Sequence, residues 1–294
     1  MAPAIVSDVE LPARVVPETL ATPASKASTS KLFSLEGKTV AITGGARGLG
    51  ITLAIAVVEA GGSVACLDIL EQPSADEWAL LNKIAKANGS SVSYQRCDVT
   101  NEDSVDEVMT AIATEADKNG APFWGCIACA GIQQQLSAFD YPAADFDRIL
   151  KVNVTGVFNT CKYTARVLRD RKTPGSIVMI ASMSGNIANR GLACTAYNTS
   201  KAAVQQMCRS LAQEFGEYQI RCNTLSPGYI RTAMTDQLLI ENPEVEKTWM
   251  AGALLGRLGA PEDFKAPAVF LLSEGASFVH GSDLRVDGGH CASA

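Results

Sequence analysis

Two side chains suited to proton transfer stand four residues apart in the second half of the chain. Tyr197 and Lys201 fall in a segment whose pattern predicts a helix over Ala196–Phe215, so the phenol and the ammonium share one helix face. A free phenol titrates near pH ~10, and its use as a base at neutral pH requires roughly 4 kcal/mol of stabilisation. A neighbouring ammonium supplies part of that. The pair could form an acid/base site, although at this spacing it is most often a surface contact.

Two polar residues elsewhere could serve the same site. Ser182 follows Ile177–Ala181, an apolar run that predicts a buried strand, and open parallel sheets bind ligands at the carboxyl ends of their strands. Its hydroxyl could hold a carbonyl oxygen and the alkoxide that develops from it. Ser184 is the alternative, at a point where the chain is expected to have turned away. Asn153 lies in a long apolar helix, either as a structural hydrogen-bonding residue or as the holder of a water behind Lys201.

A glycine-rich turn near the start of the chain predicts a phosphate site. The strand expected over Thr39–Thr43 leads into it, and a helix is expected over Gly48–Glu59. Glycines permit a tight turn and a close approach of the backbone to a pyrophosphate, which the positive end of the helix dipole attracts. The placement between strand and helix therefore favours a dinucleotide bound by Gly44, Arg47, Gly48, Leu49 and Gly50.

The next strand end indicates which dinucleotide binds. Asp68 follows the strand expected over Ser63–Leu67, where a carboxylate can accept hydrogen bonds from both ribose hydroxyls of an adenosine. It would also repel a 2′-phosphate, by about 4 kcal/mol per charge pair at 4 Å. The sequence therefore predicts NAD, with NADP as the alternative because Arg47 could turn toward a 2′-phosphate.

Two later strand ends fit the same ligand. Asp98 and Val99 close the third predicted strand, and Asp98 could bind the adenine amino group or cap the helix entered near Asn101. Ala130 and Gly131 close the fourth, and both are small enough to let the cofactor pass close by.

These residues need a scaffold that gathers strand ends, and the chain beyond residue 34 predicts one. Short apolar runs alternate with longer helical segments, which implies right-handed crossovers and a parallel sheet covered on both faces. We therefore expect an α/β, Rossmann-type doubly wound parallel sheet in a single catalytic domain, 35–294, behind a flexible N-terminal arm, 1–34, rich in Ala, Pro, Ser and Thr. Strands are expected over Thr39–Thr43, Ser63–Leu67, Ser91–Arg96, Phe123–Ala128, Ser176–Ala181, Ile220–Leu225 and Leu284–Val286. Helices are expected over Gly48–Glu59, Ala75–Ala87, Ser104–Lys118, Phe146–Arg169, Ala196–Phe215 and Pro261–Leu272.

Composition excludes several classes of protein. A net charge of −6 argues against a nucleic-acid partner. The two histidines, His280 and His290, leave little for a Ser-His-Asp hydrolase or a metal site, and no metal is expected. The nine cysteines, including the pair Cys126 and Cys129, are interpreted as core thiols of a reduced cytosol. With no apolar run near the ~20 residues of a membrane span, we expect a cytoplasmic protein without a membrane partner.

Taken in order, these motifs resemble the short-chain dehydrogenases/reductases over Leu35–Gly289. The resemblance implies that Tyr197 is the general acid/base and that Lys201 holds the nicotinamide ribose and lowers the tyrosine pKa. It also implies that Ser182 orients the carbonyl and that Asn153 supports a proton-relay water. The matching motifs are Thr43-Gly44-x-x-x-Gly48-x-Gly50, Asp98, Ala130-Gly131, Asn153, Ser182, Tyr197-x-x-x-Lys201 and Pro227-Gly228.

The same resemblance extends to the C-terminal third. It implies a mobile substrate lid over Thr232–Thr248 and a last strand and loop, Asp283–Gly289, that helps form a homo-oligomer, a tetramer or a dimer. It further implies that the nicotinamide side is lined by Pro227, Gly228, Ile230 and Thr232. Two departures stand out: Cys129 replaces a strand-supporting Asn of the family, and the Gly185–Thr195 loop is slightly enlarged.

Substrate choice is left open by the residues. The stretch Ala181–Asn189 is similar to that of fungal polyol and ketose reductases, such as the mannitol, sorbose and arabinitol enzymes. This implies hydride transfer between a nicotinamide cofactor and a secondary alcohol or ketone. Asn186, Asn189 and Arg190 could bind a hydroxylated chain or simply turn the loop. A bulkier specialised-metabolite or steroid-like ketone would suit Tyr229, Met234, Leu238, Leu239, Trp249 and Met250. A dinucleotide-sensing protein without chemistry is a further alternative, disfavoured by the complete Asn153–Ser182–Tyr197–Lys201 set.

Overall fold

The computed structural model of the chain describes residues 27–231, 239–240 and 243–292. Most of the predicted arm, Thr232, and the lid residues Met234 and Leu238 lie outside the described residues. Within the described part, a short helix, α1 (Thr29–Leu32), occupies the end of the segment predicted as an arm. Leu35, just beyond it, is fully buried.

The centre of the molecule is one sheet of seven strands, all paired in parallel. Its order is β3-β2-β1-β4-β5-β6-β7, which reverses direction between β1 and β4. This order confirms the Rossmann-type fold and creates a crevice at the carboxyl ends of β1 and β4, where ligands of such sheets bind. The strands are β1 (Thr39–Thr43), β2 (Ser63–Asp68), β3 (Val92–Arg96), β4 (Phe123–Ala128), β5 (Gly175–Ile180), β6 (Ile220–Pro227) and β7 (Asp283–Val286).

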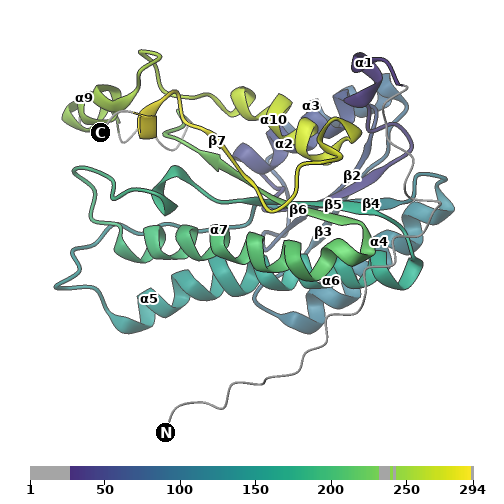
Figure 1. Ribbon diagram of the computed structural model, residues 1–294, viewed down its shortest axis with the longest axis horizontal. Coiled ribbons are helices and arrows are strands. Elements are labelled where there is room, and N and C mark those ends of the chain that lie inside the picture. Colours follow the sequence, from purple (N-terminus) through teal and green to yellow (C-terminus); the bar gives the residue numbers. More distant parts are fainter. Residues whose placement is uncertain (1–26, 232–238, 241–242, 293–294) are drawn as a thin grey trace, which may run out of the picture.

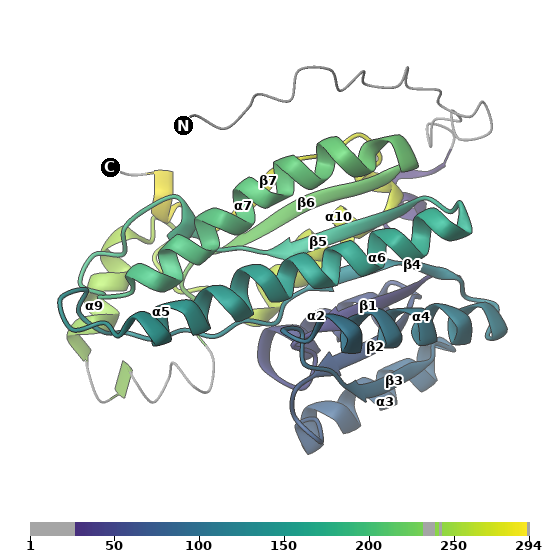
Figure 2. The same ribbon diagram turned by 90° about the horizontal axis from the view of Figure 1, so that it is seen from below.

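Helices cover both faces of this sheet (Figures 1 and 2). One face carries α2 (Gly48–Glu59), α3 (Ala75–Asn88) and α10 (Lys265–Leu272), while the other carries α4 (Glu102–Lys118), α6 (Val157–Arg171) and α7 (Thr195–Phe215). Every residue of β1 and of β5 is buried, as expected for strands with helices on both faces. No helix among the described residues has both the length and the apolar character needed to cross a membrane.

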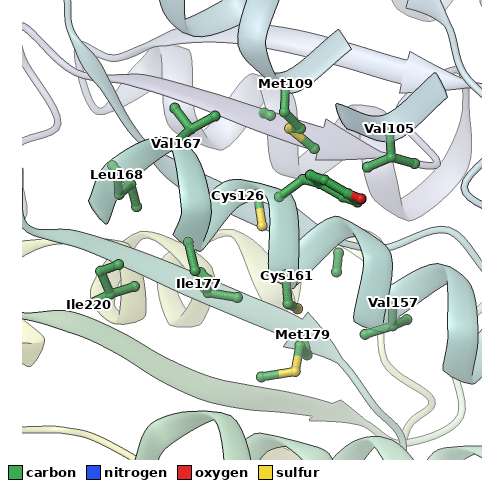
Figure 3. Packing of buried hydrophobic residues seen from close by; sticks show 14 of the residues in the cluster. Val105, Met109, Cys126, Val157, Cys161, Val167, Leu168, Ile177, Met179 and Ile220 are labelled. Carbon is green, nitrogen blue, oxygen red and sulfur yellow. The ribbon is translucent and has the colours of Figure 1, made fainter. Parts of the chain in front are cut away.

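Two hydrophobic clusters hold the helices to the sheet, one on each face. Figure 3 shows the cluster beneath α4 and α6, where side chains of these helices meet those of the central strands. Cys126 and Cys161 are fully buried there. All nine cysteines are free thiols, and seven of them are buried, whereas Cys129 and Cys291 are half-buried. The labelled residues are Val105, Met109, Cys126, Val157, Cys161, Val167, Leu168, Ile177, Met179 and Ile220.

The helix expected over Pro261–Leu272 begins as a 3-10 turn, Pro261–Phe264, and two larger differences from the expected helices lie elsewhere. The single helix predicted over Phe146–Arg169 is α5 (Ala143–Leu150), then a π-helical turn, η3 (Lys151–Gly156), then α6. Each flanking segment keeps its own helical period, so the extra residue of such a turn is visible only as a shift in phase between the two segments, which a single expected helix ignores. A further helix, α9 (Pro243–Gly252), forms within and beyond the segment expected only as a lid.

Candidate active site

The glycine-rich turn between β1 and α2 is closed by direct backbone packing. Gly44 has φ +70°, and a Cβ there would lie 2.9 Å from the Cα of Ala130 at the end of β4. A Cβ on Gly50 would lie 2.0 Å from the Gly44 carbonyl oxygen, so only glycine lets α2 begin so close to the turn. No Cβ of Gly44 or Gly50 crowds the turn where the predicted pyrophosphate would bind. The Gly48 N–H donates to Glu77 Oε1 at 3.3 Å, so the start of α2 already holds an anionic oxygen and fits such a group.

Asp68 is held in a fixed orientation beside that turn. Its Oδ2 accepts a hydrogen bond from the Ala46 N–H at 3.2 Å, and its Oδ1 accepts one from the Leu70 N–H at 3.2 Å. Asp68 is half-buried at the end of β2, whereas Arg47 is exposed. The structure therefore places a carboxylate at the rim of the turn, as the sequence predicts for an adenosine ribose site.

The turn after β3 shows that Asp98 does not cap the helix that follows. Its Oδ1 accepts hydrogen bonds from the N–H of Thr100 at 2.9 Å and from its hydroxyl at 2.8 Å. Asn101 caps α4, through a hydrogen bond from the Ser104 N–H at 3.0 Å. The capping role considered for Asp98 is thus wrong, because the residue three positions further on is better placed. Val99 is buried beside it, and its carbonyl accepts from Asn159 at 3.0 Å.

The end of β4 is supported by a hydroxyl rather than by an amide. The Thr43 Oγ1 accepts hydrogen bonds from the N–H groups of Cys129 at 3.2 Å and Ala130 at 3.3 Å. This compensates for the amide missing at Cys129. A Cβ on Gly131, the next residue, would lie 3.4 Å from Asn153 Oδ1 and 3.7 Å from Lys201 Nζ. Gly131 therefore borders both the cofactor path and the predicted catalytic residues.

Asn153 serves as a structural hydrogen-bonding residue in this structure. It is fully buried in η3, and its side chain makes two hydrogen bonds to the backbone of Ile132, at 2.8 and 2.9 Å. Its Nδ2 also donates to Ser200 Oγ at 3.0 Å, and that hydroxyl donates to the Tyr197 carbonyl at 2.7 Å. The sequence analysis did not single out Ser200, although it belongs to the same motif. The network fixes the helix turn that carries Tyr197.

Ser182, rather than Ser184, lies beside the phenol of Tyr197. The Ser182 hydroxyl lies close enough to the Tyr197 phenol to lower its pKa, which opposes the effect of burial. It also accepts the Ser184 N–H at 3.1 Å and approaches the Pro227 carbonyl oxygen at 3.5 Å. The backbone of Ser184 thus orients Ser182, because the chain enters the 3-10 turn Met183–Gly185 there.

Tyr197 and Lys201 lie on one face of α7, as the spacing predicts, and both are protonated near neutral pH. Burial raises the pKa of Tyr197 to about 12 and lowers the pKa of Lys201 to about 8. The Lys201 ammonium donates to the Ile180 carbonyl at 2.8 Å and lies 5.5 Å from the centroid of the Tyr197 ring. A half-buried, protonated phenol beside a serine hydroxyl is a proton donor that can reach a carbonyl oxygen.

A side chain that the sequence analysis missed ties this site together. Gln205 is one helical turn beyond Lys201 and is buried. Its Nε2 lies 3.1 Å from the Ser182 carbonyl oxygen, 2.6 Å from Asn186 Oδ1 and 3.1 Å from Ser226 Oγ. The i, i+4, i+8 spacing of Tyr197, Lys201 and Gln205 is the signal that could have found it. Gln205 thereby joins the serine loop to the helix that bears the phenol.

The segment after β6 also turns back on the last strand. The Gly228 N–H donates to the Val286 carbonyl at 2.9 Å, and a Cβ on Gly228 would lie 2.7 Å from the Cα of Asp287. Ile230 pairs with Gly259 in an isolated parallel bridge. Pro227, Gly228 and Ile230 thus follow the same strand edge as Ser182, whereas Thr232 lies outside the described residues.

Metal-binding arrangements are absent from the described residues, in which no group of three or more His, Cys, Asp and Glu side chains could hold an ion. His280 accepts the Cys222 N–H at its Nδ1, 3.1 Å away, and its Nε2 lies 2.8 Å from the Ala212 carbonyl oxygen. It therefore has a structural role. Tyr229 lines a cavity of about 170 Å³, and none of the catalytic candidates is among the lining residues.

A family model and known proteins match nearly the whole domain. The model described as enoyl-(acyl carrier protein) reductase matches residues 44–290. A protein named short chain dehydrogenases/reductase notP′, from Aspergillus versicolor, is 43% identical over 269 residues, 90% of this chain and 91% of that protein. The D-arabinitol 2-dehydrogenase (ribulose-forming) of Candida albicans (strain WO-1) is 34% identical over 268 residues, 88% of this chain and 94% of that protein.

A solved structure agrees with both sequence matches. The NADPH-dependent 3-quinuclidinone reductase of Rhodotorula rubra superposes with a TM-score of 0.83 at 34% identity, over 95% of this chain and 100% of that one. The predicted resemblance, including the likeness to a fungal arabinitol enzyme, is thus confirmed. The names of these two enzymes give an alcohol, D-arabinitol, and a ketone, 3-quinuclidinone, as their substrates, so the matches do not agree on one substrate.

Proposed function

Because the chain belongs to the short-chain dehydrogenase/reductase family, we propose that Tyr197, Ser182 and Lys201 are its catalytic residues. The reaction is hydride transfer between a nicotinamide cofactor and a secondary alcohol or ketone. The observation that carries the proposal is the half-buried Tyr197 phenol, which lies beside Ser182 and on the helix face of Lys201.

The nicotinamide supplies or accepts the hydride when it is bound. Ser182 orients the substrate oxygen by a hydrogen bond, and Tyr197 gives its phenolic proton to that oxygen during reduction. The pKa of about 12 keeps this proton in place near neutral pH. Alcohol oxidation requires the opposite transfer, so a positive charge near the phenol must lower its pKa, and Lys201 is the cation on the same helix face.

The cofactor residues support NAD as the preferred dinucleotide. The Asp68 carboxylate is fixed by two backbone N–H groups where the adenosine ribose would lie, and its charge disfavours a 2′-phosphate. The Rhodotorula reductase is NADPH-dependent, which supports NADP as the alternative. The exposed Arg47 would be the residue that supports NADP if Asp68 did not decide the choice.

Three further properties complete the proposal. Chemistry without a metal is supported by a proton donor already present in Tyr197. Assembly into a homo-oligomer, a tetramer or a dimer, is supported by fully exposed phenylalanines at Phe139 and Phe278. Light scattering of the purified chain measures its mass in solution, and a monomer would contradict the proposed homo-oligomer. A cytoplasmic location is supported by nine free cysteines.

The decisive experiment is the substitution Tyr197→Phe, assayed with NADH and a panel of polyols, ketoses and bulky ketones. We expect turnover to fall by at least about 10³-fold, because the substrate oxygen loses its proton donor, while the Kd for NADH stays within about twofold. Phe keeps the ring and its packing. Activity equal to that of the unsubstituted chain would overturn the assignment.

A further inference from the structure

A second phenol at the same edge of the sheet has a proton to give. Asn189 Nδ2 donates a hydrogen bond to the hydroxyl oxygen of Tyr229 at 3.0 Å. The Oδ1 of the same amide lies 3.7 Å from the Cys194 Sγ, whose nearest acceptor is Asn198 Oδ1 at 3.2 Å. Since the Tyr229 oxygen already accepts, its own O–H is directed elsewhere. None of the described residues accepts that proton.

The ring that bears this hydroxyl is held in place by aromatic packing. Tyr229 stacks on Trp249 of α9, with ring centroids 4.3 Å apart and planes 4° from parallel. The ring of His290 meets it edge-on at 5.1 Å. Trp249 is only 5% exposed, so the stack is an interior wall rather than a loose surface contact. A hydroxyl on a ring fixed in this way is a preorganised donor.

The position of Tyr229 links it to the reacting groups. It stands two residues beyond Pro227, whose carbonyl oxygen is 3.5 Å from Ser182 Oγ. Its partner Asn189 belongs to the loop between Ser182 and Tyr197. The Cys194 thiol in the same loop is close enough to both phenols to affect their pKa values. The two phenols therefore border one loop, at the carboxyl edge where substrates bind.

We propose that Tyr229 determines specificity by donating a hydrogen bond to a second oxygen of the substrate. The inference rests on the proposed function, since it concerns the same site. Preferred substrates would then be ketones or alcohols with another acceptor oxygen close to the reacting carbon, such as α-hydroxy ketones, vicinal diols and diketones. Asn189 is a positioning residue that acts through Tyr229. A site built to hydrogen-bond a substrate oxygen discriminates strongly against analogues that lack it.

The test compares matched ketones on two variants. NADH-dependent reduction of three cyclic or aryl ketones is measured beside that of their α-hydroxy counterparts, for the unsubstituted chain, Tyr229→Phe and the control Tyr218→Phe. The phenylalanine at 229 keeps the stack on Trp249 and removes only the hydroxyl, while Tyr218 is an exposed tyrosine on the surface. We expect the unsubstituted chain to prefer the α-hydroxy ketones in kcat/KM by at least about tenfold.

In Tyr229→Phe, that preference should fall by about 10- to 100-fold, mainly through a higher KM for the α-hydroxy ketones, with the plain ketones unchanged. Tyr218→Phe should change neither. Equal effects on both ketone classes, or none on either, would overturn the inference while leaving the proposed function intact. Failure of the unsubstituted chain to reduce any of the ketones would overturn the proposed function and this inference with it.

Discussion

The two halves of the carboxyl edge are built in different ways. On the β1–β2 side, the site is shaped by backbone: Gly44 and Gly50 bring chain against chain, and Asp68 is oriented by two N–H groups. On the β5–β6 side, the site is shaped by side chains, with Gln205 joining three polar groups. The first half is expected to tolerate almost no added volume, whereas the second depends on hydrogen-bond partners.

This difference suits one half of the edge to a constant ligand and the other half to a ligand that changes from enzyme to enzyme. A dinucleotide presents the same pyrophosphate in every enzyme that binds it, so a rigid backbone cradle serves. A substrate pocket is more easily altered when side chains on a fixed sheet shape it. Substitutions in the two halves should therefore fail for different reasons, and four experiments examine this.

The largest effect is expected from Gly50→Ala. Its Cβ would lie 2.0 Å from the Gly44 carbonyl oxygen, so α2 must move away from the turn and the N–H groups leave the pyrophosphate. We expect the Kd for NADH, measured by fluorescence titration, to rise at least about 100-fold, with a lower Tm. Gly48→Ala is the matched control, because nothing lies within 4 Å of its Cβ and only its φ of +58° is strained. That variant should lose about 1–2 kcal/mol of stability. Similar NADH binding by both variants would refute the steric cradle.

The side-chain half is tested by Gln205→Leu against Gln206→Leu. Gln205 is buried in the network around Ser182, whereas the neighbouring Gln206 bonds to Arg209 on the surface. Displacing Ser182 should lower kcat about 10- to 100-fold and leave NADH binding unchanged. The alkaline limb of the pH–rate profile should also move upward, since the Ser182 hydroxyl lowers the pKa of Tyr197. An equal loss in both variants would show that the network is only structural.

Cofactor choice is expected to change with Asp68→Asn. The amide removes the charge that repels a 2′-phosphate but keeps much of the shape of the side chain. We expect the ratio of kcat/KM for NADH over NADPH to fall about tenfold, less than a buried charge would give because Asp68 is only half-buried. Arg47→Ala is the complementary variant. If that substitution, and not Asp68→Asn, changes the ratio, Arg47 determines the choice.

The smallest effect concerns stability. The pKa of Lys201 is about 8 in the folded chain, whereas the ordinary pKa of a lysine is 10.5. Between pH 8 and pH 10.5 the unfolded chain therefore binds more protons than the folded chain. The stability cost of burying this charge is therefore present below pH 8 and disappears as the pH rises toward 10.5. Lys201→Met should be inactive yet more stable at pH 7, by roughly 1–3 kcal/mol after loss of the bond to Ile180. Calorimetry at pH 7 and pH 10 should show the advantage shrinking, and a lower Tm at pH 7 would contradict it.

Sequence patterns predicted the sheet well because burial on both faces leaves a direct imprint. Each of the seven strands begins and ends within two residues of its expected bounds. The Gly44–Gly50 turn and the Tyr197–Lys201 spacing were also recognised, since both are local. The prediction of a buried asparagine at position 153 was met, with hydrogen bonds to Ile132 and Ser200.

Long-range partners were harder to foresee. Gln205 meets groups 19 to 23 residues away from it, and the stack of Tyr229 on Trp249 joins two separate elements. Nothing local indicates that a polar side chain on an amphipathic helix points inward to such a partner. The cap of α4 shows the same limit on a smaller scale, because Asp98 and Asn101 are both good capping residues and only the backbone path decides.

The π-helical turn η3 determines what a one-residue deletion in this helix would do. Such a turn differs from a regular helix by a single inserted residue, and removing one residue from 151–156 would restore ordinary i→i−4 pairing. The helix downstream would then rotate by about 100°, and Asn153 would lose Ile132 and Ser200 together. The same rotation would turn Val157, Cys161 and Leu168 of α6 out of the hydrophobic cluster that they share with β4 and β5, so the deletion should cost stability as well as the site. The irregular turn thus aligns two features at once, the core face of α6 and the side chain of Asn153.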